Sequence, residues 1–285
     1  MVADNDTQPA AGSALARGIG ILRCFSGRQQ QLSRKELVAR TGLPKATISR
    51  LTQTLCELGL LRPAAPPGSF VLGPDVLTFA PAVLGRLSLR HVARAAMQEL
   101  ADHARAQVTI SAGTGAGLVF VEICQGEGSK VFRPEIGTRL SLTRTASGRA
   151  YLLAEQPHIR ERLLHRLTEE DSAQAAWLTK RLSDTCQDLT QRGFAHNVGD
   201  MHPDIMGAAI PVRAPAGQIL VFTCTVTAFQ ATQEQLLADI GPRLMAVVKG
   251  VEAALPEQAA TIDWSNSAPR KTSRVRWDVP TTALP

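Results

Sequence analysis

The stretch LSRKELVARTGLPKATISRLTQTLCELGLL, residues 32–61, decides the fold of the N-terminal third of the chain. Ser33 and Glu36 have the spacing of a capping box, which predicts a helix from Ser33 to about Arg40, followed by a break at Thr41, Gly42 and Leu43. Pro44 suits the first turn of a following helix, because the N–H that proline lacks has no helical partner there. The stretch therefore predicts a pair of helices joined by a short glycine-containing turn.

The second of these helices has an apolar face and a polar face. Its apolar residues recur at helical spacing and are expected to be buried: Ile48, Leu51, Leu55 and Leu58. The first turn and the opposite face carry side chains that can hydrogen-bond to base edges or phosphates: Lys45, Thr47, Ser49, Arg50 and Gln53. In the major groove, arginine pairs with guanine and glutamine with adenine. This pattern predicts a DNA recognition helix, with Ser33 as a further contact from the helix before it.

The residues on either side of the helix pair complete the predicted domain. Leu61-Arg62, a turn rich in Pro and Gly, and the stretch Ser69 to Leu72 predict a two-stranded hairpin. From this hairpin, Arg62 and Ser69 are expected to reach a phosphate or the minor groove. Upstream, a first helix is expected to bury a stripe of four residues, Leu15, Ile19, Leu22 and Phe25. The N-terminal third is thus predicted to be a winged helix-turn-helix that binds DNA.

The net charge of the chain comes from the same third. The 285 residues include 31 Lys and Arg and 25 Asp and Glu, which gives a net charge of +6. Residues 1–90 contain 11 basic and 5 acidic residues, whereas residues 91–285 contain 20 of each. A basic module joined to a neutral one indicates that the first binds a polyanion and the second has another task. A solvated basic face is the alternative that charge alone leaves open.

The composition excludes several classes of protein. With 44% hydrophobic and 20% charged residues, the chain can bury a core and is neither disordered throughout nor fibrous. The longest apolar run, residues 217–229, is shorter than the roughly 20 residues that span a bilayer. Residues 1–12 have no signal-peptide pattern, so a cytosolic protein without a membrane partner is expected. The five cysteines lack metal-site spacing, so we expect reduced thiols and neither a metal nor a cofactor.

The rest of the chain alternates between helix and strand patterns. A helical stripe over residues 73–90 is interrupted by Pro81, which can kink or break the helix, and consists of Val76, Phe79, Val83 and Leu87. A further helix is expected over residues 89–106. Strands are then expected at residues 107–111, 117–123, 130–132, 193–197, 206–212 and 218–227, and helices at 149–154, 156–167, 173–191 and 232–255. This order predicts an α/β sensor layer on a mixed sheet.

Four segments of the sequence together resemble the IclR family of bacterial transcriptional regulators. ALARGIGILRCF (residues 14–25) is similar to the first helix of the family, and residues 32–61 are similar to its helix-turn-helix. FRPEIGTRLSLTRTASGRAYLLA (residues 132–154) and GFAHNVGDMHPDIMGAAIPV (residues 193–212) are similar to segments of its ligand domain. The resemblance covers roughly residues 13–255. It implies a winged helix-turn-helix, a linker helix and a C-terminal GAF-like α/β domain that binds a small effector and makes oligomer contacts.

The expected organisation follows from these patterns and from the resemblance. It comprises a disordered N-terminus (1–12), a winged helix-turn-helix (13–75), a linker helix (76–90), a GAF-like domain for effector binding and oligomerisation (91–255) and a disordered tail (256–285). Because Trp264 and Trp277 lie in the tail, its docking on the body or on a second subunit is the alternative. The expected partners are double-stranded operator DNA, a small organic acid effector and further copies of the chain, in a homodimer or homotetramer.

The expected effector site combines a helix start with polar side chains from other segments. Ala146-Ser147-Gly148 precedes a helix, so its backbone N–H groups and the positive helix end can bind an anion. Thr223 and Thr225 share one face of the last strand, while His196 and Asp200 come from the preceding loop. The resemblance implies a pocket at the same places, Ala146, Ser147, Gly148, Asp200, Thr223 and Thr225. A plain N-cap at the helix start and ordinary strand-forming threonines are the alternatives.

The chain departs from the family pattern at several of these positions. The family usually has Glu at Asp200, a small Cys, Ser or Ala at Gly207, and serines in place of the strand threonines. Val226-Thr227 also stands where Gly-Pro is frequent. The extra methyl groups narrow the expected pocket and Gly207 widens it, so the resemblance implies no particular effector.

No motif of an enzyme emerges from the sequence. Residues 113–117, GTGAG, are followed by a strand pattern and not by a helix, so we expect a hairpin turn and not a dinucleotide loop. Nucleophile-elbow, P-loop and zinc-protease motifs are absent, and we assign no catalytic residue. Two alternatives stay open. One is an architectural DNA binder without a ligand. The other is an enzyme with a DNA-binding appendage, using a thiol of Cys124, Cys186 or Cys224 with His196 or His202.

Overall fold

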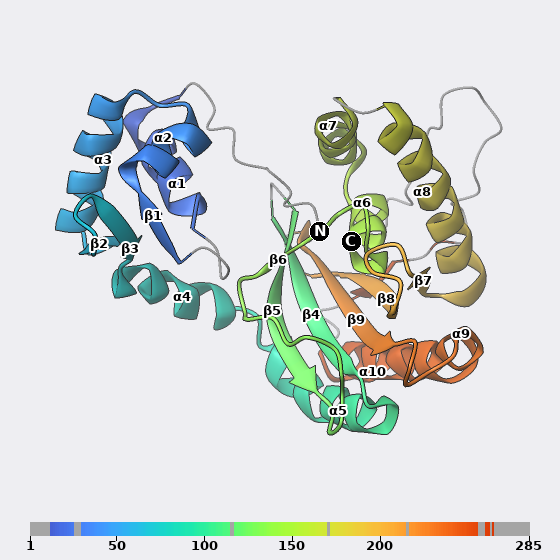
Figure 1. The fold of residues 1–285 in the computed structure, drawn as a ribbon. Helices are drawn as coiled ribbons and strands as arrows, with labels where there is room; N and C mark the ends of the chain where they lie inside the picture. The colour runs from blue at the N-terminus through green and yellow to red at the C-terminus, as the bar shows by residue number, and fades with distance from the viewer. Residues whose placement is uncertain are drawn as a thin grey trace. The chain divides into compact units, whose positions relative to one another are not determined.

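The computed structural model of the chain describes residues 12–25, 30–114, 117–169, 172–214, 217–255, 260–262 and 264. These residues belong to two compact units, which divide between Leu87 and Ser88 (Figure 1). The first unit contains the predicted helix-turn-helix, and the second contains the predicted sensor layer.

The first unit combines short helices with a small antiparallel sheet. Its first elements are α1 (Ala14–Arg23), β1 (Gln31–Ser33), α2 (Arg34–Thr41), α3 (Lys45–Glu57), β2 (Leu61–Ala64) and β3 (Ser69–Leu72). Strands β2 and β3 form the predicted hairpin. Strand β1 was not predicted from the sequence and pairs with β3, so the sheet order is β1-β3-β2. The winged helix-turn-helix fold is thereby confirmed.

Local side-chain chemistry fixes the helix-turn-helix. Ser33 Oγ accepts a hydrogen bond from the Glu36 N–H at 3.3 Å, and the Glu36 carboxylate accepts one from the Ser33 N–H at 2.8 Å, so the capping box is confirmed. Hydrogen bonds from the side chain and backbone of Ser33 lower the pKa of Glu36. Gly42 ends α2 with a φ of +66°, a left-handed conformation that glycine adopts without strain. Pro44 is the N-cap of α3.

The buried face of α1 differs from the predicted one. Leu15 is 75% exposed and Ile19 is 40% exposed, whereas Ile21 and Cys24 lie in the core of the first unit. The sequence of α1 contains two overlapping apolar stripes, and periodicity does not tell which of them packs inward. The prediction that Leu15 and Ile19 are buried is therefore wrong, while Phe25 is buried as predicted.

Helix α3 buries most of its predicted face. Ile48 and Leu55 are buried, but Leu58 is exposed because the helix ends at Glu57 and Leu58 is the C-cap residue. Thr52 is fully buried, and its hydroxyl donates to the Ile48 carbonyl at 2.8 Å. That hydrogen bond offsets the cost of placing a hydroxyl in the core.

The expected linker helix is a pair of short segments. A 3₁₀ helix, η1 (Pro74–Phe79), continues into α4 (Ala80–Leu84), which ends at Gly85. Pro81 lies in the first turn of α4, where proline is tolerated, so it starts this helix instead of kinking it. Of the predicted stripe, Leu87 is buried, whereas Phe79 and Val83 are exposed.

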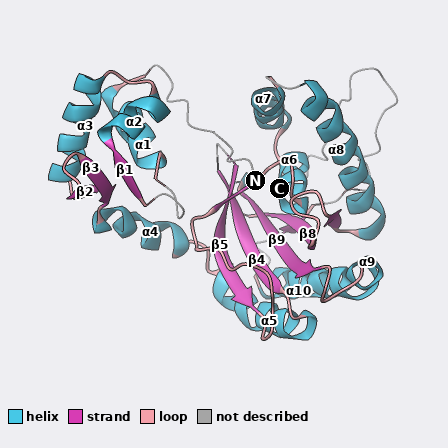
Figure 2. Cartoon of the chain, viewed as in Figure 1, coloured by secondary structure: helices cyan, strands magenta, loops and turns pink. Residues whose placement is uncertain are grey.

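The second unit is a sheet with helices on both faces (Figure 2). Its elements are α5 (Leu89–Ala104), β4 (Gln107–Thr114), β5 (Gly117–Gln125), β6 (Arg139–Leu140), α6 (Ala146–Ala154), α7 (Pro157–Thr168), α8 (Ser172–Arg192), β7 (Ala195–Val198), β8 (Ile205–Arg213), β9 (Ile219–Thr227), α9 (Gln233–Gln235), the π-helix η3 (Leu236–Ile240), α10 (Gly241–Ala254) and β10 (Ala260–Thr261). The strand order is β10-β8-β9-β4-β5-β6, and β7 pairs with β8. Helices α5 and α10 cover one face and α6 covers the other, with α8 packed on α6 and β7. This arrangement is consistent with the predicted GAF-like fold.

The sheet corrects two expectations. Every strand pair in the described part of the chain is antiparallel, so the predicted mixed sheet is wrong. Thr114 pairs with Gly117, so β4 and β5 form a hairpin at GTGAG and a strand follows it, as predicted. Residues 130–132 form no strand, and the Lys130 N–H instead donates to the Gln230 side chain at 3.2 Å.

Part of the C-terminal tail belongs to the second unit. Ala260 and Thr261 pair with the end of β8, and the side chains of Ile262 and Trp264 are buried in the core. For these residues the expected disorder is wrong, because burial of two large apolar side chains stabilises a docked strand. Trp277 and the rest of the tail lie outside the described residues, as do residues 1–11. None of the helices in the described ranges is both long and apolar enough to cross a membrane.

Candidate DNA interface and effector pocket

The first candidate site is the outer face of α3. Lys45, Arg50 and Gln53 are exposed, and Thr47 and Ser49 are half-buried beside them. Within the described part of the chain, Arg50 makes no side-chain hydrogen bond or ion pair, so its guanidinium is available to a ligand. Gln53 donates to the Glu57 carboxylate at 3.1 Å, a contact that a base edge can replace. The helix therefore presents donors and acceptors of the kind used in major-groove recognition.

The other three residues predicted to bind DNA differ in their access to solvent. Ser33 is half-buried, and its hydroxyl donates to the Glu36 carboxylate at 2.7 Å within the capping box. Arg62 is exposed on β2. Ser69 is buried in the centre strand of the small sheet, which disfavours a contact with a phosphate. Of the hairpin residues, the geometry thus favours Arg62 and disfavours Ser69.

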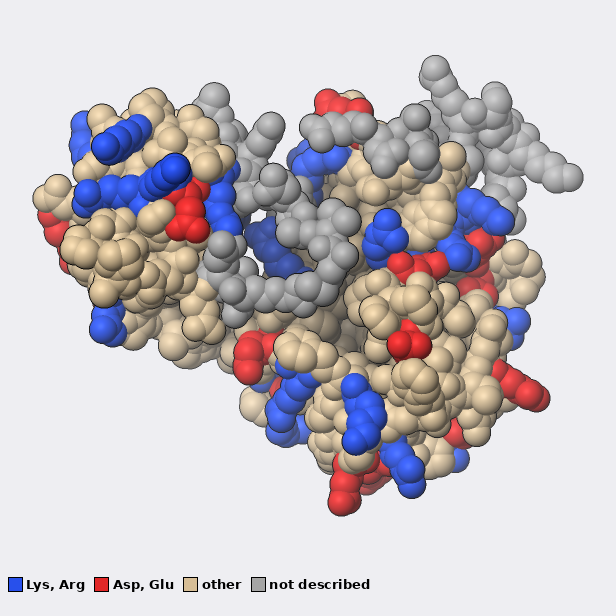
Figure 3. Space-filling model, in the orientation of Figure 1, with Lys and Arg blue, Asp and Glu red and all other residues tan. Residues whose placement is uncertain are grey.

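Basic side chains predominate on the surface of the first unit. On its visible face, Lys and Arg outnumber Asp and Glu (Figure 3). The exposed basic residues of α2, α3 and β2 are Arg34, Lys35, Lys45, Arg50 and Arg62. Arg34 also lies over the ring of Phe70, 5.6 Å from its centroid, and its N–H donates to the Gly68 carbonyl at 2.9 Å, which ties the hairpin to α2. Arg34 and Lys35, together with the exposed Ala46 and Thr54 of α3, were not predicted from the sequence as contact residues.

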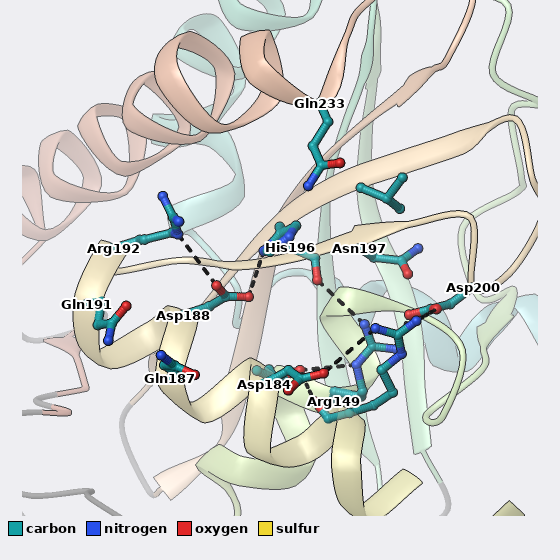
Figure 4. Close-up of a pocket in the computed structure, with 13 residues that line it drawn as sticks. Arg149, Asp184, Gln187, Asp188, Gln191, Arg192, His196, Asn197, Asp200 and Gln233 are labelled. Atoms are coloured by element: carbon teal, nitrogen blue, oxygen red, sulfur yellow. Dashed lines mark hydrogen bonds and ion pairs between the residues drawn. The ribbon is translucent and has the colours of Figure 1, made fainter. Parts of the chain in front are cut away.

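The second candidate site is a polar pocket of about 370 Å³ between α8, β7 and the loop of residues 199–204 (Figure 4). The charged and amide side chains that line it are Arg149, Arg181, Asp184, Gln187, Asp188, Gln191, Arg192, His196, Asn197, Asp200 and Gln233. His196 and Asp200 were predicted to be site residues, and both line this pocket. The predicted helix start and strand threonines do not line it.

A buried ion-pair network forms one wall of the pocket. The Arg149 side chain is 2% exposed, and its guanidinium pairs with the Asp200 carboxylate at 3.0 Å. Arg149 also donates to the Thr185 hydroxyl at 3.1 Å and to the Thr143 carbonyl at 2.9 Å. Arg181 binds the second oxygen of Asp200 at 2.7 Å. Burial lowers the pKa of Arg149, and the Asp200 carboxylate opposes that shift.

The predicted helix start is buried and bonded within the chain. Thr145 is the N-cap of α6, and its hydroxyl accepts a hydrogen bond from the Gly148 N–H at 2.9 Å, so neither Ser147 nor a ligand fills that role. Ala146, Ser147 and Gly148 are all buried. A Cβ atom on Gly148 would clash with the main chain of Ser141 and Leu142. The close approach that Gly148 permits is therefore to the protein's own backbone.

The strand threonines lie on the face of the sheet that α6 covers. On that face Gly207 pairs with Thr225 and also with Asn197 on its other side. Three buried polar atoms on the same face have no hydrogen-bond partner among the described residues: Ser111 Oγ, Asn197 Oδ1 and Thr223 Oγ1. Such atoms mark a place that a water or a polar ligand can occupy. Asn197 belongs to this face of the sheet and also lines the polar pocket, so the two sites adjoin at this residue.

His196 lies on the opposite side of β7 from Asn197, since neighbours along a strand alternate. Its Nδ1 atom lies 2.6 Å from the Asp188 carboxylate, which also pairs with Arg192 at 3.5 Å. The Arg149 guanidinium reaches the His196 carbonyl at 3.5 Å. The imidazole is thus held by α8, and it is the backbone of His196 that contacts the Arg149 network.

The thiols considered as nucleophiles are buried. Burial raises the pKa of Cys124 and Cys186, and it raises the pKa of Cys224 to about 12. A thiol with a raised pKa stays protonated near neutral pH and is a poor nucleophile. In the described ranges, no group of three or more His, Cys, Asp or Glu residues is placed to hold a metal ion.

Three residues that organise the pocket were not predicted from the sequence: Arg149, Arg181 and Asn197. A signal existed for Arg149, because a single charged residue interrupts the otherwise small and apolar segment ASGRAYLLA of α6. A charged side chain at a buried helix position needs a partner of opposite charge. No comparable signal exists for Arg181 or Asn197, whose neighbours come from distant segments.

Two family models match the chain. The model of the IclR helix-turn-helix domain matches residues 14–64, and that of the bacterial transcriptional regulator IclR C-terminal domain matches residues 81–251. Among curated proteins, the HTH-type transcriptional regulator TsaQ1/TsaQ2 of Comamonas testosteroni is 29% identical over 246 residues, which cover 85% of this chain and 88% of that protein.

Solved structures have the same fold. The crystal structure of an IclR family transcriptional regulator from Brucella abortus is 36% identical, with a TM-score of 0.80 over 88% of this chain and 98% of that one. An IclR homologue from Microbacterium hydrocarbonoxydans, complexed with 4-hydroxybenzoate, is 20% identical, with a TM-score of 0.65 over 86% of this chain and 99% of that one. The second similarity concerns the fold alone.

Proposed function

Because the chain belongs to the IclR family of bacterial transcriptional regulators, we propose that it binds operator DNA through α3 and the β2–β3 hairpin and that a small organic acid in the second unit alters this binding. The proposal that the protein binds DNA rests on the side chains exposed on the outer face of α3. There Lys45, Arg50 and Gln53 stand exposed in the helix that follows the Gly42 turn. An exposed arginine and glutamine on such a helix suit base recognition in the major groove.

The proposal that the second unit binds a small organic acid is supported by the polar groups in its interior. Ser111, Asn197 and Thr223 have buried polar atoms without a hydrogen-bond partner among the residues that the structure describes, and a bound ligand with hydroxyl or carboxylate groups would satisfy them. The 4-hydroxybenzoate of the Microbacterium homologue carries both groups, which supports a small organic acid as the effector class. Ligand binding would reach the DNA-binding unit through η1 and α4, the segments that lie before α5 in the chain.

Titration of the purified chain with its own upstream intergenic DNA tests this function. At about 0.15 M salt, with random duplex as competitor, we expect preferential binding of the upstream DNA. A panel of small carboxylic acids, 4-hydroxybenzoate included, is expected to contain one that weakens or strengthens that binding. Equal binding of random duplex would contradict operator recognition and favour an architectural DNA binder. Specific binding that no acid alters would contradict the proposed role of a small organic acid.

We further propose that the protein acts as a homodimer or homotetramer. The first unit exposes apolar side chains on α1 and on the segment that follows β3: Leu15, Ile19, Leu77, Phe79 and Val83. Exposed apolar side chains gathered in one small domain are typical of an association surface. Association of two copies would also place two recognition helices on one operator.

Substitution of one of these side chains tests the oligomer. Phe79→Glu is expected to weaken self-association by about tenfold, because it places a charge where an apolar contact is proposed. Analytical ultracentrifugation measures the change. Phe229→Glu alters a more exposed aromatic side chain of the second unit, 82% exposed against 63% for Phe79, and should leave self-association unchanged if the copies join through the first unit. An unaltered association constant in Phe79→Glu would show that this face does not join the copies.

We propose that the chain has no catalytic activity and works in the cytoplasm, where operator DNA lies. The raised pKa of the buried thiols and the absence of an enzyme motif support the first statement. Turnover of any effector by the purified protein would favour the alternative of an enzyme with a DNA-binding appendage.

A further inference from the structure

The ion-pair network of the pocket links two packed helices to a loop with exposed residues. Arg149 lies in the middle of α6, and Arg181 lies on α8, so two packed helices position both guanidinium groups. Asp200, the carboxylate between them, belongs to the loop that connects β7 to β8. In that loop Met201 and His202 are exposed, and Gly199 turns the chain with a φ of +75°. The carboxylate is therefore the member of the network that can leave while the arginines stay in place.

The position of the Asp200 carboxylate has the properties of an anion site. Its two oxygens lie 3.0 Å from Arg149 and 2.7 Å from Arg181, and the Asp200 side chain is 6% exposed. The pocket of about 370 Å³ adjoins this position and provides room for a small organic molecule. Asn197, which lines the same pocket, has a buried Oδ1 atom without a partner in the described ranges. Arginine pairs bind carboxylates, and an unpaired amide oxygen accepts a hydrogen bond from a hydroxyl group.

We propose that Asp200 is an internal anion that occupies the Arg149–Arg181 site in the free protein, and that a small carboxylate carrying a hydroxyl group binds by displacing it, an inference that rests on the proposed ligand binding by the second unit. The exchange replaces one carboxylate by another, so the buried guanidinium of Arg149 is never left unpaired. Displacement releases the loop of residues 199–204 from α6 and α8. The loop between β7 and β8 is then the first element of the protein to respond to the ligand.

Chemical rescue with acetate tests this role. Asp200→Ala removes the carboxylate and leaves both arginines, and free acetate supplies the same charge and the same two oxygens on a molecule with one extra methyl group. We expect acetate to raise the melting temperature of Asp200→Ala with a midpoint concentration at least about tenfold below that for the unchanged protein, as for a charge-assisted hydrogen bond to a buried group. Sodium chloride at matched ionic strength controls for screening. Scanning calorimetry of the full chain supplies the readout.

Further variants keep the test decisive. Asp200→Asn retains the shape of the side chain and loses its charge, so it should respond to acetate at intermediate concentrations, and it serves if Asp200→Ala fails to fold. Asp239→Ala removes an exposed carboxylate that pairs with Arg243 outside the pocket, and it should respond like the unchanged protein. Addition of Arg181→Gln to Asp200→Ala should reduce the rescue. Equal acetate dependence in the unchanged protein and both Asp200 variants would overturn the proposal. This readout involves no DNA, so a failure of operator binding is distinguishable from it.

Discussion

Replacement of Glu122 by alanine is expected to lower the free energy of unfolding of the second unit by about 3 kcal/mol or more. Glu122 lies on β5 with its side chain 4% exposed, and its carboxylate binds Arg90 at 2.9 Å and Arg94 at 2.6 Å. Both arginines belong to α5, so the carboxylate fixes that helix to the sheet. Its removal leaves the largely buried charge of Arg90 without its partner carboxylate, and an uncompensated buried charge is costly.

Scanning calorimetry of the full chain measures this effect. A loss of about 3 kcal/mol corresponds to a fall of roughly 6–12 °C in the melting temperature of a unit of this size. Asp239→Ala is the matched control, since Asp239 also binds two cationic side chains, Arg243 at 2.6 Å and His103 at 2.9 Å, but is 45% exposed. Exposed pairs contribute less than about 1 kcal/mol, so the control should lose at most a few degrees. Equal losses in the two variants would mean that burial is not what makes the Glu122 pair important.

The first unit was predictable wherever neighbours in sequence determine the structure. Ser33 and Glu36 are three residues apart, so the capping box could be read directly, and Gly42 ends the helix by its own conformational freedom. The β2–β3 hairpin likewise depends on a short turn. Strand β1 was missed because a three-residue strand has no periodicity of its own and exists only through its pairing with β3.

Several features that could not be predicted from the sequence depend on contacts between segments that are distant in the chain. Helix α1 has apolar residues on more than one face, and its packing against α2 and α3 selects Ile21 over Leu15 for the core. The antiparallel arrangement of the large sheet depends on which strands become neighbours, which alternation along one strand does not specify. The docking of Ile262 and Trp264 depends in the same way on an apolar surface that other segments build.

The two candidate sites differ in how far apart their residues lie in the sequence. The outer face of α3 follows from the directions of side chains on one helix, so Lys45, Arg50 and Gln53 could be named before any fold was known. The polar pocket draws on α6, α8, β7 and a loop, and its central pair of Arg149 and Asp200 spans 51 positions of the chain. The sequence indicated Asp200 through family resemblance, and it contains a signal for Arg149, but it does not indicate Arg181 or the pairing of these three side chains.

Arg50→Ala is expected to lower the affinity for the specific operator by roughly 10- to 100-fold while weakening the binding of random duplex much less. Arg50 is exposed on α3 and makes no side-chain hydrogen bond or ion pair within the described residues, so we expect its loss to leave the fold of the first unit intact. A bidentate arginine contact with guanine distinguishes one base pair from another, whereas phosphate contacts act on all sequences alike. Fluorescence anisotropy with the upstream intergenic duplex and a random duplex measures both affinities.

Two comparisons separate base recognition from charge. Arg243→Ala removes one positive charge from an exposed position of the second unit, so it should leave both affinities nearly unchanged. Lys45→Ala should weaken both duplexes by a similar factor and reduce the salt dependence of binding by about one ion, as expected for a phosphate contact in the first turn of α3. If Arg50→Ala instead weakened both duplexes to the same extent as Lys45→Ala, Arg50 would be a phosphate contact. Base recognition by α3 would then have to be assigned to Gln53 and Thr54, whose side chains are also exposed.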